Sequence, residues 1–598
     1  FYMKLTQSNL LNFRKTLPTY SVRDDLITQI LNSKNRVTVV CSATGSGKST
    51  QIPQYIHEYD QTLRITCTQP RRVAAISISQ RVAIEQNCTL GNEVGYSVRF
   101  DEKQSDLTKI CYKTDGIAVR EALIDQKFSK VDVFIVDEAH ERSVNTDLLI
   151  GLLKQALTLN QTLRVVIMSA TLDTRFFANY FQTDQILFVQ GKMFPVRHQF
   201  LAKQENNYIE AISLLVLQLH TSKPKGDILV FLPGEREILT VINTVLLLSQ
   251  SDSESTLEML PLYANLTQKD QLKIFEPSTK RRCICATNIA ETSLTVPNIS
   301  FIIDSGFVRT KIFDSALQIQ RLLTIPASKS QILQRCGRAG RVCEGEAYHI
   351  YSFQNYDILQ QSDVPEILRS DLSLIYLTLL GCGVRDLPGF DFLTQPTAVQ
   401  KKYALKNLLL SQLISVEGGE FRLTQLGQRV ISLPLEIEEA LCVVHSLQTC
   451  QEVSDEICKL IAILNSVEQF FVAADESVKQ QRIQFVNGRS DHLMLLQVYN
   501  AFMEADNRPQ FCKRFGVQLR TMEYIQKVEK QLRDIRAQLV KKMGIVLSRG
   551  ERDENEILKI LAKGYCNNVV VRGKDDRSYE KQGLVALIHP SSGVKSGP

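Results

Sequence analysis

The chain has 598 residues, of which 44% are hydrophobic and 22% charged, and its formal net charge is +6 at pH 7. This length is too great for a single hydrophobic core, since domains hold roughly 150 residues each, and about four domains are expected. The composition is that of an ordinary soluble globular protein. No apolar run is long enough to cross a bilayer, and no basic-plus-apolar signal opens the chain, so no membrane association is expected.

The small net charge permits nucleic-acid binding without arguing for it, because a local groove can be far more basic than the average. The 14 cysteines, in a chain without a secretion signal, indicate reduced thiols of the cytosol or nucleus. Cys283 and Cys285 alternate along an apolar stretch with no second pair nearby, which favours core packing over a zinc site. The chain begins with Phe1 rather than Met, which fits a missing natural N-terminal segment.

Short β-rich runs alternate with helical patterns in the first half of the chain. This alternation predicts parallel sheets that are covered by helices on both faces. The pattern restarts after Pro195, so two successive α/β domains are expected. The predicted strands are 36–41, 64–68, 131–136 and 165–168 in the first domain and 227–232, 282–286, 300–304 and 347–351 in the second, with a helix over 147–157.

The chain becomes mostly helical after about residue 360. Leucine-rich amphipathic patterns predict helices at 367–380, 404–413 and 437–447, and a long basic and apolar pattern predicts another at 521–542. Strand signals return at 567–571 and 584–588. The tail after His589 is rich in Pro, Ser and Gly and is expected to be irregular.

A glycine-rich segment, ATGSGKST at 43–50, follows the apolar run 37–41 and predicts a phosphate-binding loop between a strand and a helix. Glycines let backbone N–H groups curl around a phosphate, and the following helix adds its positive end. Lys48 would reach the β and γ phosphates, and the Ser49 hydroxyl would ligate Mg²⁺. A plain glycine turn would supply only part of this pattern. The predicted nucleotide contacts are Thr44, Gly45, Ser46, Gly47, Lys48, Ser49 and Thr50.

A second, acidic element points to a hydrolase. The sequence DEAH at 137–140 closes the apolar run 131–136. The strand would deliver Asp137 to Mg²⁺, so Ser49, Asp137 and Glu138 are the predicted metal site. Glu138, ionised near its ordinary pKa of about 4.3, would orient and deprotonate the attacking water. A solvated acidic turn is the alternative, and it is disfavoured because α/β sheets place ligands at strand ends.

Three arginines, Arg335, Arg338 and Arg341, recur at every third residue, and on one helix this spacing places three guanidinium groups along one side. Such permanently charged groups suit phosphate oxygens and the charge that spreads during phosphoryl transfer. A solvated basic helix face is the alternative, which the phosphate loop in the same chain disfavours. The segment SAT at 169–171 either couples the Mg²⁺ site to an interdomain surface or forms a capping turn.

The chain resembles the DEAH-box RNA helicases of superfamily 2, and most closely their splicing and ribosome-assembly members. Beside the phosphate loop and DEAH, the segments that carry the resemblance occur in the family's order. They are RKTLPTY at 14–20, TQPRRV at 68–73, TDG at 114–116, SAT at 169–171, FLPG at 231–234, TNIAETS at 287–293, QRCGRAGR at 334–341, PEILR at 365–369 and HPSS at 589–592. Cys336 and Pro233 stand where other small residues are common, and little effect is expected from either.

The resemblance assigns roles within the nucleotide site. It implies that Arg338 and Arg341 are arginine fingers delivered by the second domain and that Gln334 helps to position the attacking water. The implied catalytic residues are thus Lys48, Glu138, Gln334, Arg338 and Arg341.

The resemblance also implies that Arg81 and Phe275 sandwich the nucleotide base, a contact that discriminates little between ATP and other nucleotides. Spacing alone favours an exposed helix arginine and a core phenylalanine instead.

RNA contacts are also implied by the resemblance. The residues concerned are Arg72, Arg99, Thr114, Gly234 and Thr287. For Arg71 and Arg72 a surface salt-bridge pair remains an equal alternative. Contacts to the backbone imply little sequence specificity, and only 2′-hydroxyl contacts would separate RNA from DNA.

The implied architecture is two RecA-like parallel-sheet motor domains, at 1–183 (with an N-terminal segment) and 184–358. They precede a winged-helix domain at 359–432, a helical ratchet domain at 433–545 and an oligonucleotide-binding fold at 546–598. That fold is expected to be truncated, because the chain stops soon after 589–592. A β-hairpin is implied between Phe307 and Leu323.

The implied function is an ATP-dependent RNA helicase that uses Mg²⁺ and moves 3′ to 5′ on single-stranded RNA. It would remodel RNA or RNA–protein complexes in pre-mRNA splicing or ribosome assembly. The resemblance further implies a monomer in the nucleus, with the cytoplasm as the alternative, and a glycine-patch activator protein on the winged-helix region. An RNA-binding scaffold with an inactive motor and a DNA helicase are the competing readings, and the complete set of nucleotide-site residues argues against the first.

Overall fold

The computed structural model describes the chain except for residues 1–6, 43–44, 171–173, 192–193, 204, 206, 225, 250–256, 264–265, 267–269, 272, 277, 292–295, 316, 341–342, 467–469, 472–475, 487, 546–552, 574–577, 582, 589–591 and 595–598. The chain forms two compact units. The first comprises 1–314, 319–370 and 391–397, and the second comprises 315–318, 371–390 and 398–598. No helix in the described part of the chain is long and apolar enough to cross a membrane.

The first α/β domain is built on an eight-stranded sheet in the order β4-β3-β5-β2-β6-β7-β1-β8. All neighbouring strands are parallel except β3 and β4. The strands are β1 (Val37–Ser42), β2 (Ile65–Gln69), β3 (Val94–Val98), β4 (Asp101–Lys103), β5 (Ile110–Thr114), β6 (Val133–Val136), β7 (Arg164–Ser169) and β8 (Ile186–Val189). The helices are α1 (Gln7–Thr16), α2 (Arg23–Ile27), α3 (Lys48–Tyr59), α4 (Arg72–Glu85), α5 (Asp115–Ala122), α6 (Val144–Leu159) and α7 (Thr174–Phe181).

The second α/β domain has a six-stranded, fully parallel sheet in the order β11-β12-β10-β13-β16-β9. Its strands are β9 (Val196–Leu201), β10 (Asp227–Phe231), β11 (Leu257–Leu262), β12 (Arg281–Ala286), β13 (Ile299–Asp304) and β16 (Gly345–Ser352). Its helices are α8 (Tyr208–Ser222), α9 (Glu235–Ser249), α11 (Lys329–Cys336) and α12 (Phe353–Asp357). The predicted hairpin is present as β14 (Phe307–Asp314) paired antiparallel with β15 (Ile319–Pro326).

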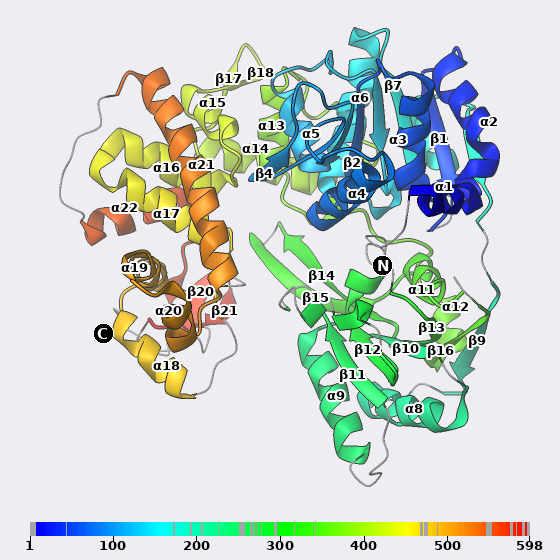
Figure 1. Ribbon diagram of the computed structural model, residues 1–598. Helices are drawn as coiled ribbons and strands as arrows, with labels where there is room; N and C mark the ends of the chain where they lie inside the picture. Colours follow the sequence, from blue (N-terminus) through cyan, green and yellow to red (C-terminus); the bar gives the residue numbers. More distant parts are fainter. Residues whose placement is uncertain are drawn as a thin grey trace. The chain divides into compact units, whose positions relative to one another are not determined.

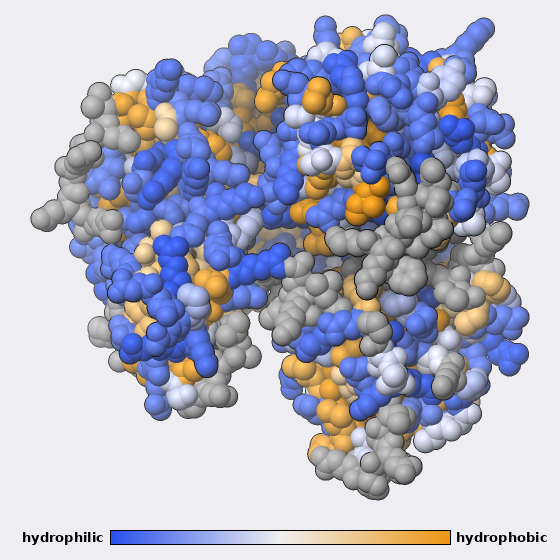
Figure 2. Space-filling model, in the orientation of Figure 1, coloured by the Kyte–Doolittle hydropathy of each residue, from blue (hydrophilic) through white to orange (hydrophobic). Residues whose placement is uncertain are grey.

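The central strands of both sheets are buried along most or all of their length, as in β1, β2 and β6 of the first sheet and β10 of the second. Figure 1 shows the strands of each sheet between flanking helices. A strand covered on both faces reads as a continuous apolar run, which is why these strands could be predicted. Cys283 and Cys285 are fully buried in β12 within the apolar core, so the prediction of core packing is confirmed. By contrast, Figure 2 shows hydrophobic surface over α9, where several leucines are exposed.

The second unit is mostly helical, as predicted. Its helices are α13 (Ser373–Gly381), α14 (Ala398–Leu410), α15 (Gln425–Ser432), α16 (Ile437–Thr449), α17 (Ser454–Leu464), α18 (Glu476–Arg482), α19 (Asp491–Glu504), α20 (Arg508–Phe515), α21 (Leu519–Met543) and α22 (Glu554–Gly564). It also holds the hairpin of β17 (Ile414–Glu417) and β18 (Glu420–Leu423), and the three-stranded sheet of β19 (Val571–Arg572), β20 (Ser578–Lys581) and β21 (Leu584–Leu587). The predicted domain boundaries within the chain stay predictions.

Two predicted elements of the C-terminal half are wrong in part. The helix predicted over 367–380 begins only at Ser373, because Asp371 accepts hydrogen bonds from the backbone N–H and the hydroxyl of Ser373 and so starts the helix there. Glu366–Arg369 instead forms a short 3-10 turn.

The strand predicted over 567–571 is largely absent. Residues Cys566–Asn568 form a 3-10 turn, and β19 covers only Val571–Arg572. The side-chain amide of Asn567 donates to Asn407 at 2.6 Å and to Ser411 at 3.4 Å, which holds this segment against α14 instead of in a ladder.

Candidate nucleotide site

The phosphate loop lies where the sequence predicts it, between β1 and α3. Gly45 and Gly47 have φ angles of 84° and 91°, which favour glycine. A Cβ atom on Gly47 would also lie 2.9 Å from Leu17 Cδ1 and 3.1 Å from Thr19 Oγ1. The N-terminal segment therefore packs directly on the loop, and the N–H and hydroxyl of Thr19 both donate to the carbonyl of Ser46. Thr44 lies outside the described residues.

Lys48 and Glu138 form a buried ion pair, with Lys48 Nζ 3.0 Å from Glu138 Oε1. Burial opposes ionisation of both groups, but each stabilises the charge of the other. The pKa of Lys48 is accordingly raised, and that of Glu138 is lowered below its ordinary range. The structure thus brings together the phosphate-loop lysine and the predicted base, and Glu138 is ionised.

Asp137 is fully buried beside this pair at the carboxyl end of β6. Gln69 Nε2 donates to Asp137 Oδ2 at 2.6 Å, and Asp137 Oδ1 accepts the N–H of Glu138 at 2.8 Å. Burial and the charge of Glu138 raise the pKa of Asp137, against the effects of Lys48 and of a hydrogen bond from Ser49. The Ser49 hydroxyl and the Asp137 carboxylate therefore meet, as the predicted metal set requires.

The donor set fits Mg²⁺. Two carboxylates and a hydroxyl are the hard oxygen ligands that this ion prefers. Glu138 Oε2 is also buried without a hydrogen-bond partner among the described residues, so this oxygen has a lone pair that is not used by a hydrogen bond. Glu138 adopts a φ of 51°, a left-handed conformation that is unfavourable for residues with a side chain and that no sequence pattern indicates.

His140 links this cluster to the SAT segment. Burial lowers the pKa of His140, so its ring is neutral. Its Nδ1 accepts the N–H of Ala170 at 3.3 Å, which places the ring proton on Nε2, 3.5 Å from Glu138. Ser169 is buried at the end of β7. Thr171 lies outside the described residues, so the role predicted for its hydroxyl stays a prediction.

Arg335 does not belong to a row of phosphate-facing arginines, and this prediction is wrong. Helix α11 ends at Cys336, so the three arginines do not share one helix. Arg335 is buried inside the second α/β domain, 2.7 Å from Asp304 and 3.2 Å from Glu291. Its role is to neutralise two buried carboxylates of its own domain.

Arg338 lies beyond the end of α11 and is buried. It donates to the carbonyl of Glu291, and its positive charge acts on both Lys48 and Glu138 in the other sheet domain. Gln334 is half-buried within α11. Arg341 lies outside the described residues, so the role predicted for it stays a prediction.

The two candidate base-stacking residues differ in environment. Arg81 donates to Glu85 and lies over the ring of Phe13 at 5.5 Å. It is held in place, in contrast to the exposed arginine that spacing alone favoured. Phe275 is 43% exposed, so it is not a core residue.

Glu85 is a central acceptor that the sequence did not reveal. Its side chain is fully buried and accepts from Gln51 and Gln54 of α3 at 2.8 Å, and Arg14 lies 3.9 Å away. It therefore joins the N-terminal segment, the phosphate-loop helix and Arg81. A glutamate in an amphipathic pattern resembles any solvated residue, and only the fold shows that it is enclosed.

The predicted RNA-binding residues occupy equivalent places in the two sheets. Thr114 ends β5, Thr287 follows β12, and Gly234 lies three residues after β10. All three thus lie at carboxyl ends of parallel strands, where α/β sheets place ligands. A Cβ atom on Gly234 would lie 2.4 Å from the guanidinium of Arg309, so a larger residue there would have to displace the end of that side chain.

The candidate arginines of the RNA surface have partners in this structure. Arg72 lies 3.7 Å from Asp101, and Arg71 lies 3.3 Å from Glu141. Both arginines therefore form salt bridges in this structure, as the alternative interpretation of the sequence expected. Arg99 lies over the ring of Phe100 at 5.0 Å.

Two family models match the chain. The DEAD/DEAH box helicase model matches residues 20–179, and the helicase conserved C-terminal domain model matches residues 208–343. The chain is also 38% identical over 608 aligned positions to the pre-mRNA-splicing factor ATP-dependent RNA helicase prp22 of Schizosaccharomyces pombe. The alignment covers 99% of this chain and 51% of that protein, so the chain spans about half the length of this relative. With two RecA-like sheet domains, the DEAH sequence and these matches, the chain belongs to the DEAH-box helicases of superfamily 2.

Proposed function

We propose that this chain is an ATP-dependent RNA helicase. The observation that carries the proposal is the buried cluster of Lys48, Asp137 and Glu138 at the carboxyl edge of the first sheet, with the charge of Arg338 acting on it from the second. A site completed by two domains hydrolyses nucleotide only when the domains close, which couples hydrolysis to movement.

The residues of the cluster would divide the work of phosphoryl transfer. Ser49, Asp137 and Glu138 would hold Mg²⁺, which neutralises phosphate charge when bound. Lys48 would exchange its contact with Glu138 for the β and γ phosphates. Glu138, already ionised, would then accept a proton from the attacking water. Arg338 and Arg341 would stabilise the charge on the transferred phosphoryl group, and Gln334 would help to position the attacking water.

The nucleotide base would lie between Arg81 and Phe275. The buried carboxylate of Glu85 fixes Arg81, and the side chain of Phe275 is 43% exposed and so accessible to a base. Stacking uses the π face that every base has, so other nucleoside triphosphates would be tolerated.

Single-stranded RNA would lie along the carboxyl edges of the two sheets. Thr114, Gly234 and Thr287 would contact its backbone there, and Arg72 and Arg99 would add charge. Phosphate would have to displace Asp101 from Arg72. Such contacts carry little sequence information, so substrate choice would come from elsewhere.

The proposal for the cellular setting rests only on the relative, which is a pre-mRNA-splicing factor. We propose a nuclear role in splicing, 3′-to-5′ movement, a monomeric state and stimulation by a glycine-patch protein. Ribosome assembly and a cytoplasmic location are the alternatives.

Stimulation of ATP hydrolysis by single-stranded RNA tests this function. We expect kcat for ATP to rise when unstructured RNA is added, and to rise less with DNA of the same sequence, measured as phosphate release. A motor that is inactive would show no magnesium-dependent hydrolysis with or without RNA. Equal stimulation by DNA would contradict the RNA assignment.

A further inference from the structure

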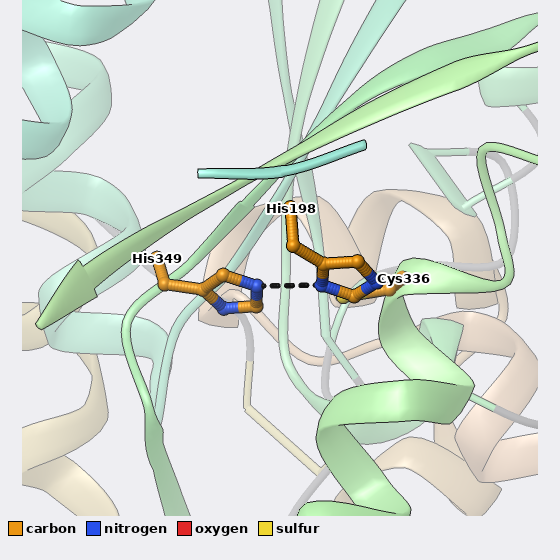
Figure 3. Close-up of side chains that lie close together, drawn as sticks. All are labelled: His198, Cys336 and His349. Carbon is orange, nitrogen blue, oxygen red and sulfur yellow. Dashed lines mark hydrogen bonds between the residues drawn. The ribbon is translucent and has the colours of Figure 1, made fainter. Parts of the chain in front are cut away.

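Three side chains with metal-ligand chemistry lie together in the second α/β domain. His198, Cys336 and His349 each offer one ligand atom, and these atoms all lie within 4.8 Å of one another. Figure 3 shows the two imidazole rings edge to edge with Cys336 beside His198. Nδ1 of His198 is 3.0 Å from Nε2 of His349. This is the one such group of three among the described residues.

The fold explains why residues so distant in sequence meet. Strands β9 and β16 are parallel, and their register pairs His198 with Ala347 and Phe200 with His349. His198 and His349 therefore project from the same face of the sheet. Cys336, the last residue of α11, packs in the apolar cluster on that face with Ala347 and Phe200. The group thus joins the edge strand, its neighbour and one helix end.

His349 is held as a metal-binding histidine is usually held. Its Nδ1 lies 2.9 Å from the hydroxyl of Tyr351 and 3.4 Å from Asp304 Oδ2, while its ring stacks on Phe200 at 4.3 Å. A carboxylate on Nδ1 fixes the tautomer and leaves the lone pair of Nε2 pointing at the cluster. His198, in contrast, is exposed on the edge strand and gives an ion a route from solvent.

We propose that His198, Cys336 and His349 bind Zn²⁺, with water in the fourth position. Two imidazoles and a thiolate form a ligand set that suits this ion. Zn–N bonds of about 2.0 Å and Zn–S bonds of about 2.3 Å in a tetrahedron separate ligand atoms by about 3.3–3.6 Å. The two imidazole nitrogens are 3.0 Å apart and no pair of ligand atoms is more than 4.8 Å apart, so small side-chain rotations would complete the site. On binding, the Cys336 thiol would lose its proton to solvent.

The site would fasten the end of α11 to the edge of the sheet. Arg338 lies two residues beyond Cys336, so the ion would also restrain the segment that carries this arginine. This contrasts with the small effect that the sequence suggested for Cys336. The site uses none of the proposed catalytic residues, so the zinc proposal can be tested independently of the proposed function.

Co²⁺, a spectroscopic substitute for Zn²⁺, tests the site in the full chain. We expect one equivalent of Co²⁺ to give a thiolate charge-transfer band that Zn²⁺ abolishes. The variants His198→Ala and Cys336→Ser should each lose the band and bind Zn²⁺ more than about tenfold more weakly, a loss that even outer partners of metal ligands can cause. Cys343→Ser, which alters an exposed cysteine on the same segment, should keep both.

A thermal measurement makes the result independent of folding defects. Zn²⁺ should raise the unfolding midpoint of the unaltered chain and of Cys343→Ser but not that of His198→Ala, whose metal-free midpoint should match the unaltered chain because His198 is exposed. Zn²⁺ binding that survives His198→Ala, or a band that disappears in Cys343→Ser, would overturn the proposal. An absence of stoichiometric binding would show that the two histidines share only a hydrogen bond.

Discussion

Glu138→Gln is expected to lower kcat for ATP hydrolysis by about 10²–10⁴-fold, the usual contribution of a positioned general base. The glutamine keeps the shape of the side chain and can still accept from Lys48, so the ion-pair partner keeps a hydrogen bond. It cannot take a proton from water. We therefore expect the affinity for a fluorescent ATP analogue to change far less than kcat, since the phosphate contacts of the loop remain.

Asp132→Asn is the matched control for this experiment. Asp132 precedes the same strand, β6, at its opposite end, and pairs with the partly exposed Arg64 at 3.0 Å. Loss of such a surface pair changes the unfolding free energy little, and the rate of hydrolysis should stay near that of the unaltered chain. Undiminished RNA-stimulated hydrolysis in Glu138→Gln would show that the catalytic assignment is wrong.

Arg338→Ala is expected to lower kcat by about 10³-fold or more, the scale of an arginine finger in phosphoryl transfer. Its charge reaches the Lys48–Glu138 pair from the second sheet domain. Arg338→Lys should restore little, because a single ammonium cannot reproduce the planar fork of a guanidinium. Hydrolysis within a few-fold of the unaltered chain would remove Arg338 from the active site.

Arg335→Met, three residues away, is expected to lower the stability of the chain, whereas Arg338→Ala is expected to lower kcat. It leaves Asp304 and Glu291 buried without their cation, and breaking a buried pair in this way costs about 3–5 kcal/mol of unfolding free energy. Burial already raises the pKa of Glu291 to about 7, and that of Asp304 is held low by Arg335. Without Arg335, the folded chain would be more stable when both carboxyl groups are protonated, because a neutral carboxyl costs less to bury than a carboxylate.

The stability deficit of Arg335→Met should therefore be largest at neutral pH and shrink as the pH falls. Urea unfolding at several pH values measures it, and Arg338→Ala should move the midpoint less than Arg335→Met does. A deficit that grows on acidification would contradict the placement of Arg335 against two carboxylates.

The two sheet domains could be predicted because their strands are buried on both faces and so appear as unbroken apolar runs. The helical half was harder. The start of α13 depends on a hydrogen bond that Asp371 accepts from the N–H of Ser373, and not on periodicity. The apolar stretch at 567–571 resembles a strand, but the side chain of Asn567 binds α14 and leaves a valine such as Val571 exposed.

The nucleotide site could be predicted where one short segment carries the chemistry, as at Lys48 and Glu138. The prediction for Arg335 was wrong, because a spacing of three residues indicates one helix face only if the helix continues, and α11 ends at Cys336. Gln69 and Glu85 were missed because their partners lie far away in sequence. The pairing of His198 with His349 likewise depends on strand register, which no local pattern shows.

The most direct test of the central claim is strand separation with single-stranded tails. RNA duplexes with a 3′ tail, RNA duplexes with a 5′ tail and 3′-tailed DNA duplexes would be compared in the presence of ATP and Mg²⁺. We predict separation of the 3′-tailed RNA alone, with none in Glu138→Gln and normal activity in Asp132→Asn. Efficient separation of DNA, or equal separation of RNA by Glu138→Gln, would contradict an RNA helicase driven by hydrolysis at this site.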